Sequence, residues 1–137
     1  MSTILVDNLT GKTSAGDITV TSEGGAATQS LQQGLAKAWW QMNGSGTPAF
    51  GDSLNSSSIT DNATGDYSVT FTNSMNNATY SALGACGRNG GSYLGGTVEI
   101  PGNAAATSSV IRFYSYNSSA STRDATFISG QINGDLA

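Results

Sequence analysis

The sequence predicts a mainly β protein, with an antiparallel β-sandwich-like body preceded by an extended N-terminal arm and one short α-helix. Ser, Thr, Asn and Gly supply 65 of the 137 residues, which is typical of short strands joined by many tight turns. Only 10% of the residues are charged, against roughly 25% in ordinary domains. Several short runs alternate apolar and polar residues, and no strand–helix–strand rhythm is present, which favours an antiparallel fold.

Residues 1–27 are expected to be an extended attachment arm. Two short β-like runs, TILVDNL and DITVTS, flank the turn TGKTSAG and are followed by the polar segment SEGGAAT. These runs hold too few apolar side chains to build a core of their own. We therefore expect the arm to become ordered by pairing with another chain or another copy of itself.

Residues 28–43 are predicted to form an amphipathic oligomerisation helix. Ser30 with Gln33 three residues later has the spacing of a capping box, and Asn43-Gly44 supplies a stop. The apolar side chains between them follow helical spacing and form one stripe, which consists of Leu31, Leu35, Ala38, Trp39 and Met42. About three turns of helix are marginal alone in water, so we expect the stripe to pack on the β body or in an oligomer interface.

Residues 44–137 are predicted to be the all-β body. The period-two pattern predicts six strands, over residues 50–60, 67–72, 79–86, 96–100, 109–116 and 125–132. Tyr114 and Tyr116 alternate with Phe113 and Ser115, and two tryptophans stand side by side at 39 and 40. We interpret these aromatic residues as packing groups, with a sugar-stacking role as the functional alternative.

Charge and hydropathy argue against nucleic-acid and membrane partners. The net charge is −4, and the five Lys and Arg residues are scattered along the chain, whereas binding to phosphates depends on clustered basic residues. No apolar run has the length of a membrane span, and the N-terminus lacks the pattern of a signal peptide. We therefore expect no membrane insertion and a chain that is made and folded in a cytoplasm.

The residues that carry chemistry are sparse. The chain has no histidine and a single cysteine, Cys86, so a thiol nucleophile would lack its usual base and Cys86 is interpreted as a small buried hydrophobe. Asp52, Asp61 and Asp66 bracket one loop and could hold calcium, although turn formation is the favoured interpretation. Glu99 has no evident partner for glycoside hydrolysis. We expect no enzyme activity, no catalytic residue, no cofactor and no metal.

Two loops are candidates for binding. The glycine-rich segment 84–96 reads as a long surface loop, and a second turn spans 117–123. Exposed loops with aromatic and adaptable polar groups are frequent binding sites. The expected receptor-binding residues are Arg88, Asn89, Tyr93 and Arg123. A plain connector is the alternative for the glycine-rich loop.

The run from residue 30 to residue 84 resembles a module that recurs in tail-fibre and related virion proteins of tailed bacteriophages. In that module a short helix ending in Lys-Ala-Trp precedes an Asn-Gly turn, the string S-I-T-D-N-x-T-G-D-Y-x-V-x-F-T and a strand with Ala-x-Tyr. The corresponding residues here are Lys37 to Trp39, Asn43-Gly44, Ser58 to Thr72 and Ala78 to Tyr80. The upstream arm also resembles the N-terminal segments of such proteins, so the likeness runs from about Ile4 to Gly84. Trp40 stands where the module is expected to have an aliphatic residue.

The resemblance implies a homotrimeric virion part without enzyme activity, assembled in the cytoplasm of a bacterial host. The expected function is that of a short trimeric tail fibre or fibre adaptor. Its arm would attach to other virion proteins, and its β domain would adhere to a glycan or protein of the host surface. The alternative is a capsid decoration, cement or head-fibre protein that stabilises or coats the phage head. The number of copies per particle separates the two.

Overall fold

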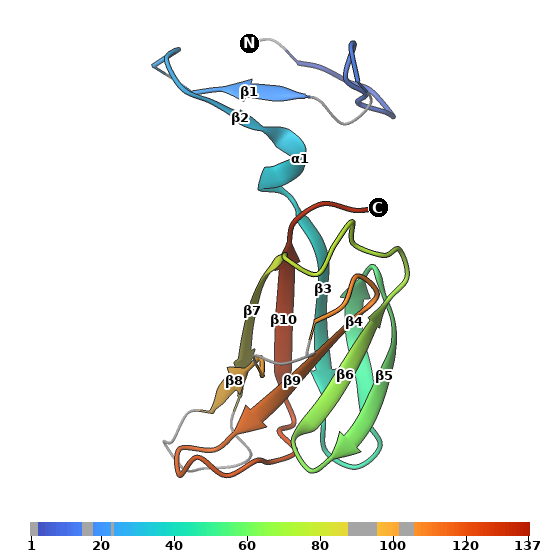
Figure 1. Cartoon of the computed structure of the whole chain (residues 1–137), viewed down its shortest axis with the longest axis vertical. Helices are drawn as coiled ribbons and strands as arrows, with labels where there is room; N and C mark the ends of the chain where they lie inside the picture. Colours follow the sequence, from blue (N-terminus) through green and yellow to red (C-terminus); the bar gives the residue numbers. More distant parts are fainter. Residues whose placement is uncertain (1–2, 15–17, 23, 88–95, 102–105) are drawn as a thin grey trace. The chain divides into compact units, whose positions relative to one another are not determined.

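The computed structural model describes residues 3–14, 18–22, 24–87, 96–101 and 106–137. The chain divides into two compact units, Met1–Leu35 and Ala36–Ala137. Its elements are mostly antiparallel strands with one short helix, so the predicted fold class is confirmed (Figure 1). Within the described residues, no helix has the length and apolar character needed to cross a membrane.

The N-terminal unit contains a small hairpin and a single helical turn. Strand β1 (Thr19–Thr21) pairs antiparallel with β2 (Thr28–Ser30), and α1 (Leu31–Gly34) follows directly. None of the described side chains of this unit is buried. An isolated two-stranded hairpin is at best marginally stable in water, so this unit lacks the means to stabilise itself.

The helix predicted over residues 28–43 is wrong beyond Gly34. The predicted cap is present, because the Ser30 side chain accepts a hydrogen bond from the backbone N–H of Gln33. The chain then becomes extended at Leu35, with φ −92° and ψ 143°. Residues Ala36–Asn43 form strand β3 instead of helix.

The burial of the two tryptophans shows why β3 is a strand. Ala38, Trp40 and Met42 alternate along it and face the core, with exposed fractions of 0%, 4% and 0%. Ala38 and Met42 satisfy helical spacing as well as period two, so they do not distinguish the two structures. A helix would bury Trp39, whereas the strand buries Trp40 and leaves Trp39 on the opposite face.

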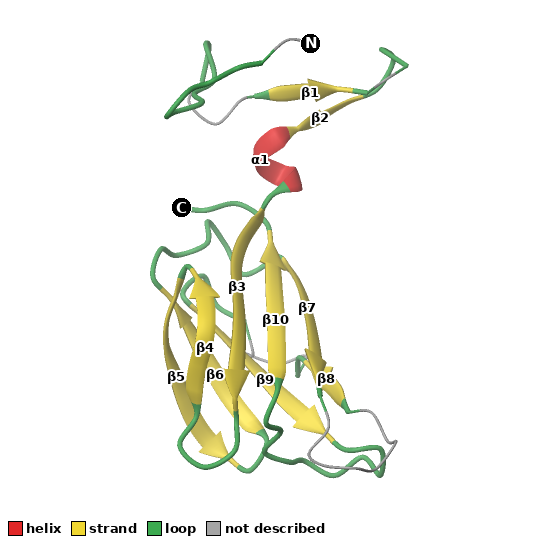
Figure 2. Ribbon diagram, turned by 180° about the vertical axis from the view of Figure 1, so that it is seen from behind, coloured by secondary structure: helices red, strands yellow, loops and turns green. Residues whose placement is uncertain are grey.

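The β body consists of two four-stranded antiparallel sheets packed face to face (Figure 2). The first sheet has the order β4-β3-β10-β7, with β4 at Ala49–Leu54, β10 at Ile128–Asn133 and β7 at Ser81–Cys86. The second sheet has the order β5-β6-β9-β8, with β5 at Ser56–Ala63, β6 at Asp66–Phe71, β9 at Val110–Tyr116 and β8 at Thr97–Glu99. Two layers that each bury one face against the other are the expected architecture of a sandwich.

The predicted strand over residues 50–60 is two strands, one in each sheet. Asn55 separates β4 from β5 and has a φ of 53°, a left-handed conformation that Asn tolerates better than most residues. Its side-chain amide donates to the carbonyl oxygens of Lys37 and Asn73, both at 3.0 Å. Its side-chain oxygen accepts from the Asn73 backbone N–H at 2.7 Å. Asn55 therefore fixes the corner where the chain passes from one sheet to the other.

Aromatic residues from both sheets form the centre of the core. The Trp40 ring from β3 stacks on Phe113 from β9, with ring centroids 5.7 Å apart. Trp40 lies directly opposite Gly130 of β10, and a Cβ built at position 130 would lie 2.2 Å from the indole. The glycine therefore makes room for the ring, which covers the neighbouring strand. Cys86 is also buried, as expected.

The string TGDY of the phage-like motif forms a structural corner. Gly65, between β5 and β6, has a φ of +68°, and a Cβ there would lie 2.5 Å from the backbone nitrogen of Arg123. Its N–H donates to the Asp124 carboxylate at 2.7 Å. The buried Tyr67 hydroxyl donates to the same carboxylate oxygen at 2.6 Å and to the Gly44 carbonyl at 3.1 Å. Burial, followed by the Asp124 contact, raises the pKa of Tyr67.

Candidate binding site on the outer face of the second sheet

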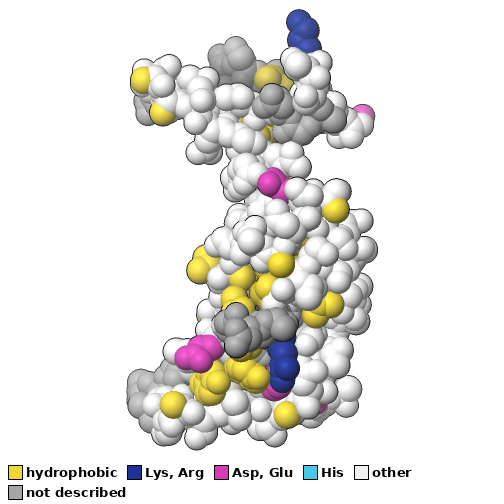
Figure 3. All heavy atoms as spheres, in the orientation of Figure 1, with side chains coloured by type: hydrophobic (Ala, Val, Ile, Leu, Met, Phe, Trp, Pro, Cys, Tyr) yellow, Lys and Arg dark blue, Asp and Glu magenta, His cyan; other side chains and the backbone are white. Residues whose placement is uncertain are grey.

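The outer face of the second sheet carries a row of tyrosine and charged side chains. Alternate residues of β9 point away from the core, so Arg112, Tyr114 and Tyr116 share this face while Ile111 and Phe113 are buried. Glu99 of β8 lies directly opposite Tyr114, and cross-strand partners share one side of a sheet. In the space-filling view, yellow side chains gather on this face beside blue and magenta groups (Figure 3).

The two tyrosines and the arginine form one contact group, here called the tyrosine face. The rings of Tyr114 and Tyr116 have centroids 6.1 Å apart and are tilted by 56°. The guanidinium carbon of Arg112 lies 5.5 Å from the centroid of the Tyr114 ring, at cation–π distance. Both rings are partly exposed. Part of each ring can therefore be reached from the surface.

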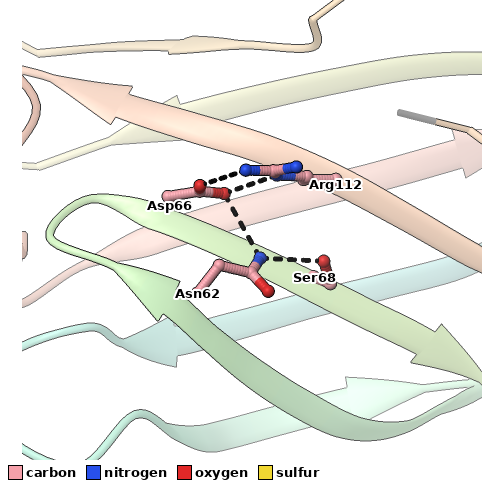
Figure 4. Close-up of polar contacts among 4 residues, drawn as sticks. All are labelled: Asn62, Asp66, Ser68 and Arg112. Atoms are coloured by element: carbon pink, nitrogen blue, oxygen red, sulfur yellow. Dashed lines mark hydrogen bonds and ion pairs between the residues drawn. The ribbon is translucent and has the colours of Figure 1, made fainter. Parts of the chain in front are cut away.

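Asp66 holds Arg112 against the sheet (Figure 4). The Arg112 Nε donates to Asp66 Oδ1 at 2.8 Å, and Nη2 bonds the second carboxylate oxygen. The Asn62 amide donates to Asp66 Oδ1 at 3.2 Å and to Ser68 Oγ at 3.0 Å. The hydrogen bond from Arg112 is the main reason that the pKa of Asp66 lies below its usual value, and the same bond raises the pKa of Arg112.

A hollow of about 440 Å³ adjoins the tyrosine face. Its lining includes Thr97 and Glu99 from β8, Tyr116 from the end of β9, and Asn117, Ser118 and Ala120 from the following turn. Because Thr97 pairs with Tyr116 and Glu99 with Tyr114, the hollow and the tyrosine face are continuous.

The turn that walls the hollow is held by its own hydrogen bonds. The Asn117 side-chain oxygen accepts from the backbone N–H groups of Ser119 and Ser121, at 2.9 and 3.0 Å. The Asn117 N–H donates to the Ser121 carbonyl at 2.9 Å, and the Ala120 N–H donates to the Asn117 carbonyl at 3.1 Å. Ala120 adopts a left-handed φ of 56°. These hydrogen bonds fix the shape of the wall.

Of the four predicted receptor-binding residues, the structure describes Arg123. Arg88, Asn89 and Tyr93 lie outside the described residues. The turn at 117–123 does border the hollow, but Arg123 is not part of the lining. Its guanidinium donates to the Gly87 carbonyl, and its Nε is buried without a partner in the described part of the chain. The structure therefore gives Arg123 a structural contact instead of a place in the hollow.

The residues of the predicted helical stripe are divided between the two compact units and do not form one helix. Ala38 and Met42 are fully buried in the core of the β body, so their side chains cannot contact a neighbouring subunit. Leu31 and Leu35 belong to the N-terminal unit, where Leu35 is 55% exposed. Trp39 lies on the outer face of the first sheet. The physical reason is the change from period 3.6 to period two after Gly34.

The suggested calcium ligands do not converge. Asp66 is committed to Arg112, and the Asp52 side chain accepts from the Ser53 backbone N–H at 2.8 Å, a local bond of the kind that favours turns. Across the described ranges, no three His, Cys, Asp or Glu side chains lie close enough to hold a metal ion.

A second surface lies on the outer face of the first sheet. Trp39 pairs with Leu54 of β4 on one side and with Gln131 of β10 on the other, and Gln131 pairs with Leu83 of β7. Leu54 and Leu83 are 47% and 68% exposed, so these three apolar side chains form a row across the sheet. A shallow hollow of about 420 Å³ separates Trp39 from Leu83. We call this surface the Trp39 row.

The tyrosine face was visible in the sequence only as an alternation. Arg112, Tyr114 and Tyr116 stand at every second position, and their shared side follows from period two alone. Glu99 and Asp66 could be added only through the pairing of β8 and β6 with β9. Comparisons of the chain with models of known protein families, with curated proteins and with solved structures found no match.

Proposed function

We propose that this chain is a structural protein of a tailed-bacteriophage virion, a short fibre or fibre adaptor whose N-terminal arm attaches it and whose β body binds the host surface. The phage-like motif of residues 58–72 supports the family. The observation that carries the attachment role is that the described part of the N-terminal unit has no buried side chain and exposes several apolar ones. The tyrosine face supports a role in adhesion, because exposed tyrosines with nearby charged groups are frequent in binding surfaces.

The arm exposes apolar side chains that a free protein would ordinarily cover. Ile4 and Leu5 are 81% and 89% exposed, and Val6 and Leu9 are each 59% exposed. Residues 3–10 form no strand or helix, so their backbone groups are free to pair with a strand of another protein. Strand addition combines such backbone bonds with pockets for alternate side chains. An arm of this kind suits attachment to a larger assembly.

The attachment role is tested by disturbing the arm in the phage. The double variant Ile4→Asp, Leu9→Asp is expected to fold its β body normally and to be missing from purified particles, because buried unpaired carboxylates are costly. The double variant Thr10→Asp, Thr13→Asp adds the same two charges at exposed positions of the arm without removing an apolar side chain, and serves as the matched control. Normal incorporation of the double variant would refute the role of the arm.

The trimeric state is part of the proposal, and it rests on the resemblance. The helical stripe no longer supports it, because Ala38 and Met42 lie in the core. The arm and the Trp39 row are the apolar surfaces that a neighbouring subunit can cover. Sedimentation equilibrium of the intact chain tests this part, and a stable monomer at micromolar concentration would contradict it.

A capsid decoration protein is the second candidate, and the Trp39 row is the observation that favours it. A sheet face that carries the exposed Leu54 and Leu83 in a row with the partly exposed Trp39 suits contact with a broad protein surface such as a capsid. Leu83→Asp is then expected to prevent binding to preformed capsids. A fibre that attaches by its arm is instead expected not to bind preformed capsids, with or without this substitution.

A further inference from the structure

We propose that the tyrosine face and its adjoining hollow bind an uncharged saccharide, and that this site discriminates against acidic sugars. This inference rests on the proposed adhesive function and names the class of its ligand. A sugar would place one apolar ring face on Tyr116, which lines the hollow, and donate hydroxyl hydrogens to the Glu99 carboxylate. Stacking on a tyrosine ring and hydrogen bonding of hydroxyls are the two contacts that an uncharged sugar offers.

The state of Arg112 argues against an acidic ligand. Two of its nitrogens are bonded to the two oxygens of Asp66, and such bidentate pairs are among the strongest hydrogen-bonded contacts in proteins. Asp66 is 6% exposed, and Asn62 gives it a further hydrogen bond. An anionic ligand would meet a guanidinium whose charge Asp66 already compensates. The Asp66–Arg112 pair therefore supplies no net positive charge, and the guanidinium carbon lies 5.5 Å from the centroid of the Tyr114 ring.

Glu99 sets the polarity of the remaining site. It is an exposed residue of β8 on the lining of the hollow, and its carboxylate has no hydrogen-bond or ion-pair partner in the described ranges. Asp66 and Arg112 compensate each other's charge, so Glu99, Asp66 and Arg112 together carry one net negative charge. A carboxylate accepts two hydrogen bonds at once, which matches two neighbouring hydroxyls of a sugar ring. It repels the carboxylate, sulfate or phosphate of an acidic glycan.

The dimensions and rigidity of the site agree with a small sugar unit. The hollow of about 440 Å³ falls within the usual range for small-molecule sites, roughly 300–1,000 Å³. The wall formed by Asn117 and the following turn is fixed by its internal hydrogen bonds, so little ordering is needed on binding. An open site of this kind binds weakly, and several linked copies would raise the avidity.

The inference is tested by binding of the intact chain to immobilised oligosaccharides. The probes are a set of neutral hexose, deoxyhexose and N-acetylhexosamine glycans, each paired with a counterpart that carries a uronic or sialic acid. We expect binding to at least one neutral glycan, weaker binding to its acidic counterpart and little change with salt. Tyr116→Ala and Glu99→Gln should each weaken the neutral interaction by about tenfold or more.

Ser58→Ala provides the matched control, because Ser58 is an exposed residue of β5, the strand at the opposite edge of the same sheet. It should bind the neutral glycan like the unmodified chain. Thermal denaturation checks that each variant is folded. Because the Glu99 side chain is exposed, Glu99→Gln should disturb the fold less than Tyr116→Ala.

Three outcomes would overturn the inference. Equal or tighter binding of the acidic counterparts contradicts the charge argument, and unchanged binding by both variants contradicts the location. The absence of any glycan binding, together with arm-dependent incorporation into particles, would overturn the inference and leave the virion role intact. Normal incorporation of the arm variant into particles would instead contradict the proposed function, whatever the glycan result.

Discussion

The two adjacent tryptophans offer a direct test of the strand that replaces the predicted helix. Trp40 is 4% exposed, stacks on Phe113 and covers Gly130. Truncation of a buried Trp or Phe to alanine costs about 3–5 kcal/mol, a large part of the roughly 5–15 kcal/mol that stabilises an ordinary domain. Trp40→Ala should therefore lower the melting temperature by at least about 12 °C. Trp39→Ala removes a partly exposed ring and should cost about 1–2 kcal/mol.

Urea denaturation followed by fluorescence measures both variants. The chain contains two tryptophans, so each variant leaves a single tryptophan, which is excited selectively at a wavelength that tyrosine does not absorb. With Trp39→Ala, the remaining Trp40 should emit at short wavelength in the native state and shift to longer wavelength on unfolding. If residues 36–43 were helical with Trp39 on the buried stripe, the two costs would be reversed. A larger loss of stability for Trp39→Ala than for Trp40→Ala would therefore refute the strand assignment.

Three further predictions concern the phage-like motif. Gly65→Ala should lower the free energy of unfolding by more than Gly46→Ala, because both have a left-handed φ but only position 65 places a Cβ against backbone atoms; equal melting temperatures would contradict this. Tyr67→Phe should cost about 1.5–3 kcal/mol in urea denaturation, through the lost bond to the Asp124 carboxylate, and a cost below about 0.5 kcal/mol would refute the contact. The pKa of Asp66 is lowered on folding, so its stabilisation is present above its unfolded pKa and is lost as the pH falls through the folded value. Asp66→Asn should flatten the pH dependence of stability below about pH 4.

The sequence predicts where the helix begins but not where it ends. Ser30 and Gln33 form the expected cap, because capping depends on neighbours in the chain. Ala38 and Met42 fit both a helical stripe and an alternating strand. The outcome was decided by the second sheet, which supplies Phe113 as a partner for Trp40. Contacts with a distant strand cannot be read from a local periodicity.

The strands of the body followed their period-two patterns more closely. The predicted strands over 67–72 and 109–116 correspond to β6 and β9, and their ends differ from the observed ends by about one residue or less. The corner at Asn55 was not predicted, although Asn followed by three serines is a turn signal, because such a signal does not show that the chain passes to a second sheet. The Asp66–Arg112 pair was also missed, because its members are 46 residues apart and meet only through strand register.

The central claim is that this chain is an arm-attached fibre component of a phage particle. Quantitative mass spectrometry of purified virions, combined with antibody labelling viewed by electron microscopy, tests it most directly. The account predicts a copy number in multiples of three, on the order of tens or fewer, with label at the tail. Hundreds of copies spread over the head would favour the decoration protein, and absence of the chain from purified virions would contradict the account altogether.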